Sequence, residues 1–193
     1  MLSRFYTVGL SIAILFSCKT KVDPAEGMVA WKNKGDSLVN RSFDTLRNTL
    51  LKAIGENGFA GAVTVCNTGA SGLMNVYAGE GTSIRRATEK FRNPANRADS
   101  TERKMIRYFR ELMRDKKELT PITEKDAEGK IHYFKPILVQ AMCLNCHGDK
   151  ITQIKPDTWQ TLQEKYPGDL AYDYKEGELR GIWHLVFSNR QTQ

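Results

Sequence analysis

The strongest constraint on this chain is the stretch Cys143-Leu144-Asn145-Cys146-His147. Two thiols at this spacing can each add to one vinyl group of a single haem, and the adjacent imidazole can then bind the iron as proximal ligand. Such a chain must also build a pocket around the macrocycle and fold in an oxidising compartment. The stretch therefore predicts one covalent haem c attached through Cys143 and Cys146, with His147 as an iron ligand.

Two other interpretations of the same cysteines stay open. A structural zinc site needs four ligands, and no second Cys/His pair stands nearby in the sequence. A redox dithiol usually follows a strand and opens a helix, often with Trp, Gly or Pro close to the cysteines. The haem interpretation requires that the chain leaves the cytoplasm, so the N-terminus bears on the choice.

The first 18 residues have the pattern of an export signal. Arg4 provides a short positive region, and residues 8–16 form an apolar run. The run ends in Leu-Phe-Ser-Cys at 15–18, which resembles the site at which bacterial lipoproteins are cleaved and lipidated. We therefore expect Cys18 to carry a lipid that tethers the exported protein on the periplasmic side of a bacterial membrane. The alternative is an uncleaved N-terminal anchor, for which the apolar run is short.

Length and charge fit a single soluble domain behind this signal. The 193 residues are 40% hydrophobic and 26% charged, and the net charge is +7. This basic excess is moderate and spread along the chain, which argues against nucleic-acid binding and leaves either a docking face for an acidic redox partner or a solvated surface. We expect a polar tether at 19–35, a haem-binding domain at 36–188 and a short tail at 189–193.

Apolar periodicity predicts two helices before the first strand. Between residues 37 and 54 apolar side chains recur at helical spacing, and Gly55 and Gly58 bracket a break. Between 59 and 77 they recur at alternating steps of four and three, which places Cys66 near the middle of an apolar stripe. The expected fold therefore begins with a pair of helices.

The rest of the chain alternates strands and helices. We expect strands at 82–90, 130–140 and 179–188, helices at 100–115 and 154–166, and a turn at 91–96. Ser100 is the expected cap of the first of these helices, and Pro136 argues for an edge or a bend in its strand. Helices followed by interleaved strands and helices predict an α+β fold, a small antiparallel sheet with flanking helices.

Several motifs follow one another along the chain. They are Arg92-Asn93-Pro94-Ala95-Asn96, Lys135-Pro136-Ile137, the stretch at 143–148, Tyr166-Pro167-Gly168-Asp169 and Gly177-Glu178-Leu179-Arg180-Gly181. Through these motifs, residues 36–188 resemble the exported haem c domains of PAS-like fold, a family long catalogued as a domain of unknown function. Its members occur as single domains and as sensor parts of larger signalling proteins. The loop at 170–174 departs from the Lys-Ala-Thr-Gly-Tyr that is frequent in the family.

The resemblance implies that the iron is held by the motif histidine, here His147, and by a cysteine thiolate from the early helix, here Cys66. On the residues alone, a lone cysteine on an apolar helical face is more often a small core residue. Cys66 is nevertheless left over once Cys18 is assigned to lipid and the motif pair to haem. Other candidate ligands, which we expect to be core or strand residues, are His132, His184, Met74, Met105, Met113 and Met142.

The propionates of a haem need cationic or amide donors. Arg92 and Asn96 are the first candidates and Arg85 and Arg86 the next, with a solvated basic loop as the alternative. Aromatic residues that either line the macrocycle or belong to the core are Phe91, Tyr133, Phe134 and Trp183.

Ligation by histidine and thiolate would stabilise ferric iron and lower the reduction potential. Because both axial positions would be filled and no catalytic constellation is found, we expect no enzyme but a protein for low-potential electron transfer or redox sensing. One alternative is a sensor that works through a partner and in which nitric oxide or carbon monoxide displaces the thiolate. Another is a haem enzyme such as a peroxidase. The sequence does not identify the redox partner proteins, and a homodimer stays open.

Overall fold

The computed structural model describes residues 24–79 and 81–188, except for the side chains at 24–26 and 68–75. The expected signal segment 1–18 with its lipidation site Cys18, and the expected tail at 189–193, lie outside the described residues. The same holds for the side chain of Met74. None of the described helices contains an apolar stretch of the length that a membrane-spanning helix needs.

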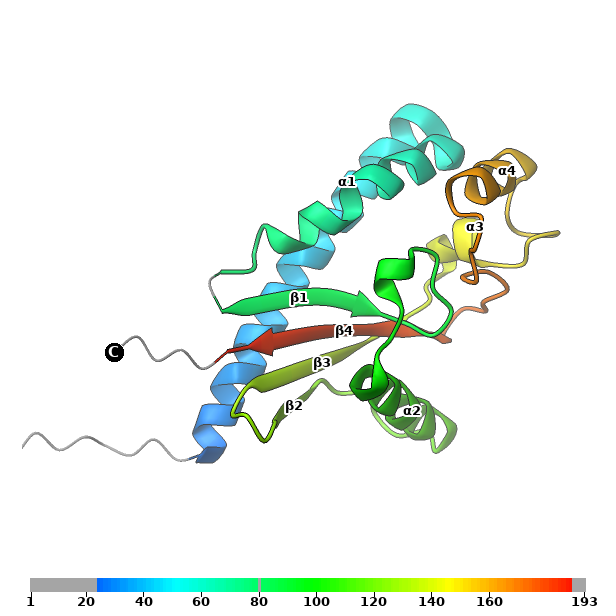
Figure 1. Cartoon of the computed structure of the whole chain (residues 1–193). Coiled ribbons are helices and arrows are strands. Elements are labelled where there is room, and N and C mark those ends of the chain that lie inside the picture. Colours follow the sequence, from blue (N-terminus) through cyan, green and yellow to red (C-terminus); the bar gives the residue numbers. More distant parts are fainter. Residues whose placement is uncertain (1–23, 80, 189–193) are drawn as a thin grey trace, which may run out of the picture.

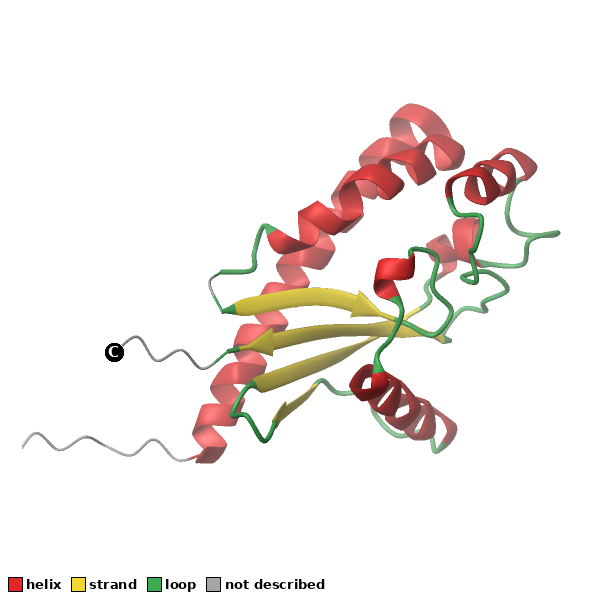
Figure 2. Ribbon diagram, in the orientation of Figure 1, coloured by secondary structure: helices red, strands yellow, loops and turns green. Residues whose placement is uncertain are grey.

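In the described residues, a four-stranded antiparallel sheet lies between helices (Figure 2), and its strand order is β1-β4-β3-β2. The elements in chain order are α1 (Pro24–Asn75), β1 (Thr82–Ala87), a 3-10 turn (Pro94–Asn96), α2 (Ser100–Arg114), β2 (Ile122–Lys125), β3 (Ile131–Leu138), a second 3-10 turn (Ala141–Cys143), α3 (Leu144–His147), α4 (Pro156–Lys165) and β4 (Leu179–Phe187). The expected α+β fold, with helical structure before a small antiparallel sheet, is confirmed.

The first helix folds back on itself. Gly58 has a φ of +66°, a left-handed conformation that favours glycine, and beyond it the chain returns towards the sheet (Figure 1). Tyr77, which follows the returning half, hydrogen-bonds through its hydroxyl to Thr45 Oγ1 of the outgoing half at 2.9 Å. The Arg41 guanidinium lies 5.5 Å from the centre of the Tyr77 ring. The two helices predicted from periodicity are therefore present, and the break between them is at Gly58.

Residues 24–35, expected to belong to a polar tether, are helical in the structure. Trp31 packs on Phe187 of β4 with ring centroids 4.9 Å apart, and Met28 contacts the same part of the core. The tether expectation is wrong for this segment because Met28 and Trp31 are partly buried against the sheet, and this burial stabilises the extra helical turns.

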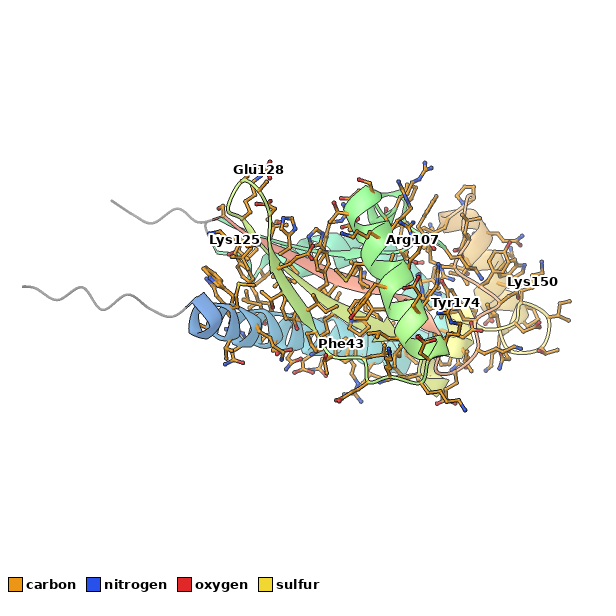
Figure 3. All side chains as sticks on the ribbon, turned by 90° about the horizontal axis from the view of Figure 1, so that it is seen from below. Phe43, Arg107, Lys125, Glu128, Lys150 and Tyr174 are labelled. Carbon is orange, nitrogen blue, oxygen red and sulfur yellow. The ribbon has the colours of Figure 1, made fainter. Side chains whose placement is uncertain are left out.

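Successive residues of the strands point to opposite faces of the sheet and build two cores. The core beneath α1 consists of Leu38, Val39, Ile84, Ile131, Tyr133, Trp183, Leu185 and Phe187. The core beneath α2 consists of Ala87, Ala98, Met105, Ile106, Phe109, Phe134, Leu179 and Ile182. Figure 3 shows α2 lying across the sheet on this second face. Tyr133 and Phe134, neighbours in β3, thus belong to different cores.

Two local details differ from expectation. The cap of α2 is Asp99 and not Ser100: the Asp99 carboxylate accepts the Glu102 N–H at 2.8 Å, and the Glu102 carboxylate accepts the Asp99 N–H at 2.9 Å. Strand β2 was not predicted because it is only four residues long and half of it is exposed. It pairs with β3 only up to Phe134, so Pro136 lies where β3 has no neighbour on that side in the described sheet, as its residue type requires.

The C-terminal elements pack against the returning half of α1. Val63 shares a buried cluster with Ile154, Leu162 and Tyr166, and Cys146 packs against it. Figure 1 shows α3 and α4 beyond one end of the sheet, with α4 near the end of α1 where the chain turns back. This packing brings the Cys-x-x-Cys-His stretch next to the helix that carries Cys66.

Candidate functional site

The Cys-x-x-Cys-His stretch forms a compact double turn. Cys143 closes the second 3-10 turn, where its sulfur accepts the Gln140 N–H at 3.4 Å, and α3 follows directly. A Cβ atom on Gly148 would lie 2.6 Å from the Leu144 oxygen, so the residue after His147 must be glycine for the chain to turn here. The cysteines at 66, 143 and 146 are free thiols and partly buried.

His147 is held by one ring nitrogen. Its Nδ1 lies 2.6 Å from the Ala171 oxygen, and because a carbonyl only accepts, Nδ1 carries the hydrogen. The other nitrogen, Nε2, then presents a lone pair, which is the arrangement found in histidines that bind metals. Burial, together with the positive charges of Arg92 and Arg180, lowers the pKa of His147 well below its ordinary value, so the ring is neutral.

The turn that supplies Ala171 is fixed by an ion pair. Arg92 Nε donates to Asp169 Oδ2 at 2.8 Å, and the two side chains are 13% and 6% exposed. Arg92 Nη2 donates to the carbonyl oxygens of Cys146 and Ala171. The Asp169 carboxylate also accepts the Ala171 N–H at 2.7 Å. Arg92, predicted as a propionate donor, therefore uses Nε and Nη2 to hold the loops around His147.

Cys66 lies in the returning half of α1 and faces the motif. It interacts electrostatically with Cys146 and with Arg86 and Arg92. Burial raises the pKa of the Cys66 thiol, and the two arginines oppose this in part. Burial likewise raises the pKa of Cys146 to about 11, so both thiols are protonated at neutral pH in the chain as it stands. The structure thus places the Cys66 thiol close to Cys146, the second cysteine of the motif, whereas its pairing with His147 on one iron stays a prediction.

Two further arginines reach the same cluster. Arg86 and Arg180 both interact electrostatically with His147, and the Nε atom of each is buried without a hydrogen-bond partner. Burial lowers the pKa of both guanidinium groups. Arg180 Nη1 donates to Thr88 Oγ1 and to the Lys90 oxygen, each at 3.1 Å. Arg180 was missed from the sequence, although its position inside the Gly177–Gly181 motif, between apolar strand residues, was a usable signal.

Other predicted site residues lie elsewhere. Arg85 points to the α2 face, where Nη2 donates to the Ala95 and Arg97 oxygens. Asn96 contacts Thr88 and Asn93 through its backbone. The aromatic residues Tyr133, Phe134 and Trp183 are core residues, whereas Phe91 is partly buried and accepts the Leu170 N–H through its backbone oxygen.

The competing ligands are also accounted for, apart from Met74. His132 and His184 bond to one another on the α2 face. Met105 and Met113 belong to α2, where Met105 is buried in the core between this helix and the sheet and Met113 packs against the same core. Met142 lies in the 3-10 turn that leads into the motif. Among the residues that the structure describes, no group of three or more His, Cys, Asp or Glu side chains is arranged to hold a metal ion.

Comparison with known proteins agrees with this architecture. The family model described as Tll0287-like matches residues 20–188. The crystal structure of the cyanobacterial heme-protein Tll0287 superposes with a TM-score of 0.58 at 23% sequence identity, covering 89% of this chain and 100% of that one, which shows a shared fold. No curated protein matches the chain. The family resemblance predicted from the motifs is confirmed, and the protein belongs to the Tll0287-like family.

Proposed function

We propose that this chain binds one haem c covalently through the thiols of Cys143 and Cys146, with His147 Nε2 as one iron ligand and the Cys66 sulfur as the other. The observation that carries the proposal is the His147 Nδ1 bond to the Ala171 oxygen at 2.6 Å. It leaves the lone pair of Nε2 for a metal, in a histidine that directly follows two free thiols at the attachment spacing. The solved relative is a heme-protein, which supports the same ligand class.

The charges around His147 suit a group with two carboxylates. Arg86, Arg92 and Arg180 all act on His147, whereas Asp169 is the one carboxylate that pairs with any of them in the described residues. An uncompensated buried cation is costly, and the orphaned Nε atoms of Arg86 and Arg180 add two donors without acceptors. Two propionates would supply the missing negative charge and the missing acceptors. We therefore assign propionate binding to Arg86 and Arg180, with Arg92 holding the loops.

The bound haem would supply one-electron redox chemistry. The ring of His147 is held in one orientation by Ala171, and Cys66 would enter as thiolate by losing its proton to solvent on binding. A thiolate ligand favours the ferric state and lowers the reduction potential. With both axial positions taken by side chains, the role that fits best is low-potential electron transfer or redox sensing, not catalysis.

We further propose that the chain works outside the cytoplasm, tethered by lipid on Cys18 to the periplasmic side of a bacterial membrane. Covalent haem attachment takes place on the exported side, and the 1–18 segment has the pattern of a lipoprotein signal. Its partners would be soluble or membrane-bound redox proteins that meet the tethered domain.

The mass and the pyridine haemochrome spectrum of the exported chain test the attachment. In a host able to mature cytochromes c, the wild type should gain the mass of one haem and give a c-type haemochrome. A chain with Cys143→Ser and Cys146→Ser should retain no haem after acid extraction. Cys66→Ser is the matched control, because it removes a thiol but not an attachment point. A wild-type chain of unmodified mass in a host that matures other cytochromes c overturns the proposal.

Binding of carbon monoxide distinguishes a redox role from gas sensing. The ferrous wild type should bind it weakly or not at all if Cys66 stays on the iron, and Cys66→Ala should bind it readily. Tight binding to the wild type would instead support the gas-responsive sensor.

A further inference from the structure

Four side chains form an unbroken hydrogen-bonded line across the α2 face of the sheet. His132 Nε2 lies 2.9 Å from Asp126 Oδ2, His132 Nδ1 lies 2.9 Å from His184 Nε2, and His184 Nδ1 lies 2.9 Å from Glu102 Oε1. The line starts at Asp126, whose side chain is 25% exposed, and ends at Glu102, whose side chain is 0% exposed. It crosses the β2–β3 turn, both central strands and α2.

The number of protons in this line follows from its geometry. Each of the three contacts needs one hydrogen between its two heavy atoms. Two neutral imidazoles bring only two hydrogens, and ionised carboxylates bring none. With two hydrogens, one contact would place two lone pairs face to face at 2.9 Å. All three contacts can be hydrogen bonds only if the line holds three hydrogens.

The surrounding charges decide where the third proton is held. Arg85 of β1 approaches Glu102 at 3.4 Å, which places a positive charge beside this carboxylate. Lys130 donates its backbone N–H to Asp126, and the bond from His132 is the largest cause of the lowered pKa of Asp126. Glu124 of β2 stands opposite His132 in the strand register and adds negative charge near the ring. Both ends of the line are therefore carboxylates, and the third proton belongs to the imidazoles.

We propose that His132 and His184 form a buried proton-binding site, a shared cation that carries three ring hydrogens between two ionised carboxylates. The proton exchanges with solvent at the partly exposed Asp126. Its uptake joins the β2–β3 turn to Glu102, the residue whose carboxylate accepts the N–H of the α2 cap, Asp99. The site is made of protein groups alone and does not depend on the proposed haem.

The line also contributes to the packing around it. The His184 ring stacks on Phe134 with centroids 4.4 Å apart and an interplanar angle of 21°, and the two histidine rings lie 5.2 Å apart. Figure 3 shows the β2–β3 turn, marked by Lys125 and Glu128, at the edge of the sheet. Loss of the shared proton would break one of the contacts that connect this turn to α2.

Nitrogen-15 NMR of histidine-labelled protein tests the proton count, and the chain has only three histidines. At pH 7 the wild type should show three of the four ring nitrogens of His132 and His184 protonated. In Asp126→Asn, the new amide can donate to His132 Nε2, so both rings should be neutral with hydrogen on Nδ1. In Glu102→Gln, the amide can donate to His184 Nδ1, so both rings should be neutral with hydrogen on Nε2.

The two variants should therefore place the ring hydrogens of His132 and His184 on opposite nitrogens. Two neutral rings in the wild type at pH 7 would overturn the proposal, and so would a ring tautomer that is the same in both variants. Asp126→Asn replaces a partly exposed side chain, so it should keep the fold even if Glu102→Gln does not.

A second measurement does not depend on the spectra. Because the folded chain holds one proton more than an unfolded chain with two neutral histidines, its unfolding constant should rise up to tenfold per pH unit as the pH rises above 7, until the proton is lost. Asp126→Asn should show no such rise over the same range. Equal slopes for the two proteins would contradict the shared proton.

Discussion

Arg92 and Asp169, 77 positions apart in the sequence, form an ion pair at 2.8 Å that holds the two loops on either side of His147. The same guanidinium donates to the Ala171 oxygen, the atom to which His147 Nδ1 is bonded. The orientation of the histidine ring is therefore coupled to a buried salt bridge outside the Cys-x-x-Cys-His stretch.

Removing the acid of this pair should be costly. Asp169→Asn leaves the Arg92 charge buried without a counter-ion, and we expect a loss of about 3 kcal/mol in the free energy of unfolding. Urea unfolding measures it. Asp44→Asn, on the exposed side of α1, is the matched control and should change stability by less than about 0.5 kcal/mol. If both variants lose the same amount, the ion pair does not have the role described.

Two glycines in α1 should respond to alanine in opposite directions. A Cβ atom on Gly35 would lie 2.3 Å from Cδ2 of Tyr133, so Gly35→Ala should push the helix off the sheet and cost about 1–3 kcal/mol. Gly55 has open space around it, and Gly55→Ala should stabilise the helix by about 0.5–1 kcal/mol. Thermal unfolding of the two variants measures both effects. A Gly35→Ala variant that is more stable than the wild type would contradict the close contact between Gly35 and the Tyr133 ring.

Protonation of the Asp36 carboxylate should lower the free energy of unfolding in acid. Burial alone would raise the pKa of this carboxyl, but hydrogen bonds from Lys32 and Tyr133 and the charges of Lys32 and Lys135 lower it overall. A folded pKa below the unfolded value adds stability above the ordinary value of about 4, and this stability is lost as the pH falls through the folded pKa. Asp36→Asn should cost about 1 kcal/mol at pH 7. Once the pH has fallen below the folded pKa of Asp36, the free energies of unfolding of the variant and the wild type should become equal, and a difference that stays constant with pH would contradict this prediction.

The second iron ligand can be tested by its spectrum. If Cys66 supplies a thiolate, Cys66→Ala should keep covalent haem, lose the thiolate charge-transfer features of the ferric protein and raise the reduction potential by an amount on the order of a tenth of a volt or more. Absorption spectroscopy and a redox titration measure both effects. An unchanged ferric spectrum would remove Cys66 from the iron.

Loss of a propionate-binding arginine should lower the reduction potential, whereas loss of the Cys66 thiolate should raise it. Arg86→Gln and Arg180→Gln should each lower the reduction potential, because a cation near the haem favours the reduced state and its loss leaves a carboxylate unpaired. The ferric spectrum should stay that of the wild type. The control Arg85→Gln, on the α2 face, should leave the potential where it was. Equal shifts for Arg85→Gln and Arg86→Gln would indicate a general charge effect and not a propionate contact.

Short-range features of this chain were determined by the sequence alone. The attachment spacing at 143–147 needs no fold to be recognised, and helical periodicity placed Cys66 on an apolar stripe because neighbours three and four apart share a face. The helices α2 and α4 and the strands β3 and β4 were also predicted within a few residues, from apolar spacing, composition and the residues that bound them. The order of the motifs also predicted the family correctly.

Tertiary structure decided which distant groups meet. Arg85 and Arg86 are adjacent and chemically equal, yet successive residues of β1 point to opposite faces of the sheet. Arg85 therefore lies beside Glu102 of α2, and Arg86 lies towards His147. The pairing of Arg92 with Asp169 and the bond between His132 and His184 join residues 77 and 52 positions apart. Local periodicity carries no information at that separation, because such contacts depend on how strands pair and which face each helix covers. The proposed haem attachment is thus a prediction that the sequence alone allows, whereas the choice of the charged residues that surround His147 depends on the fold.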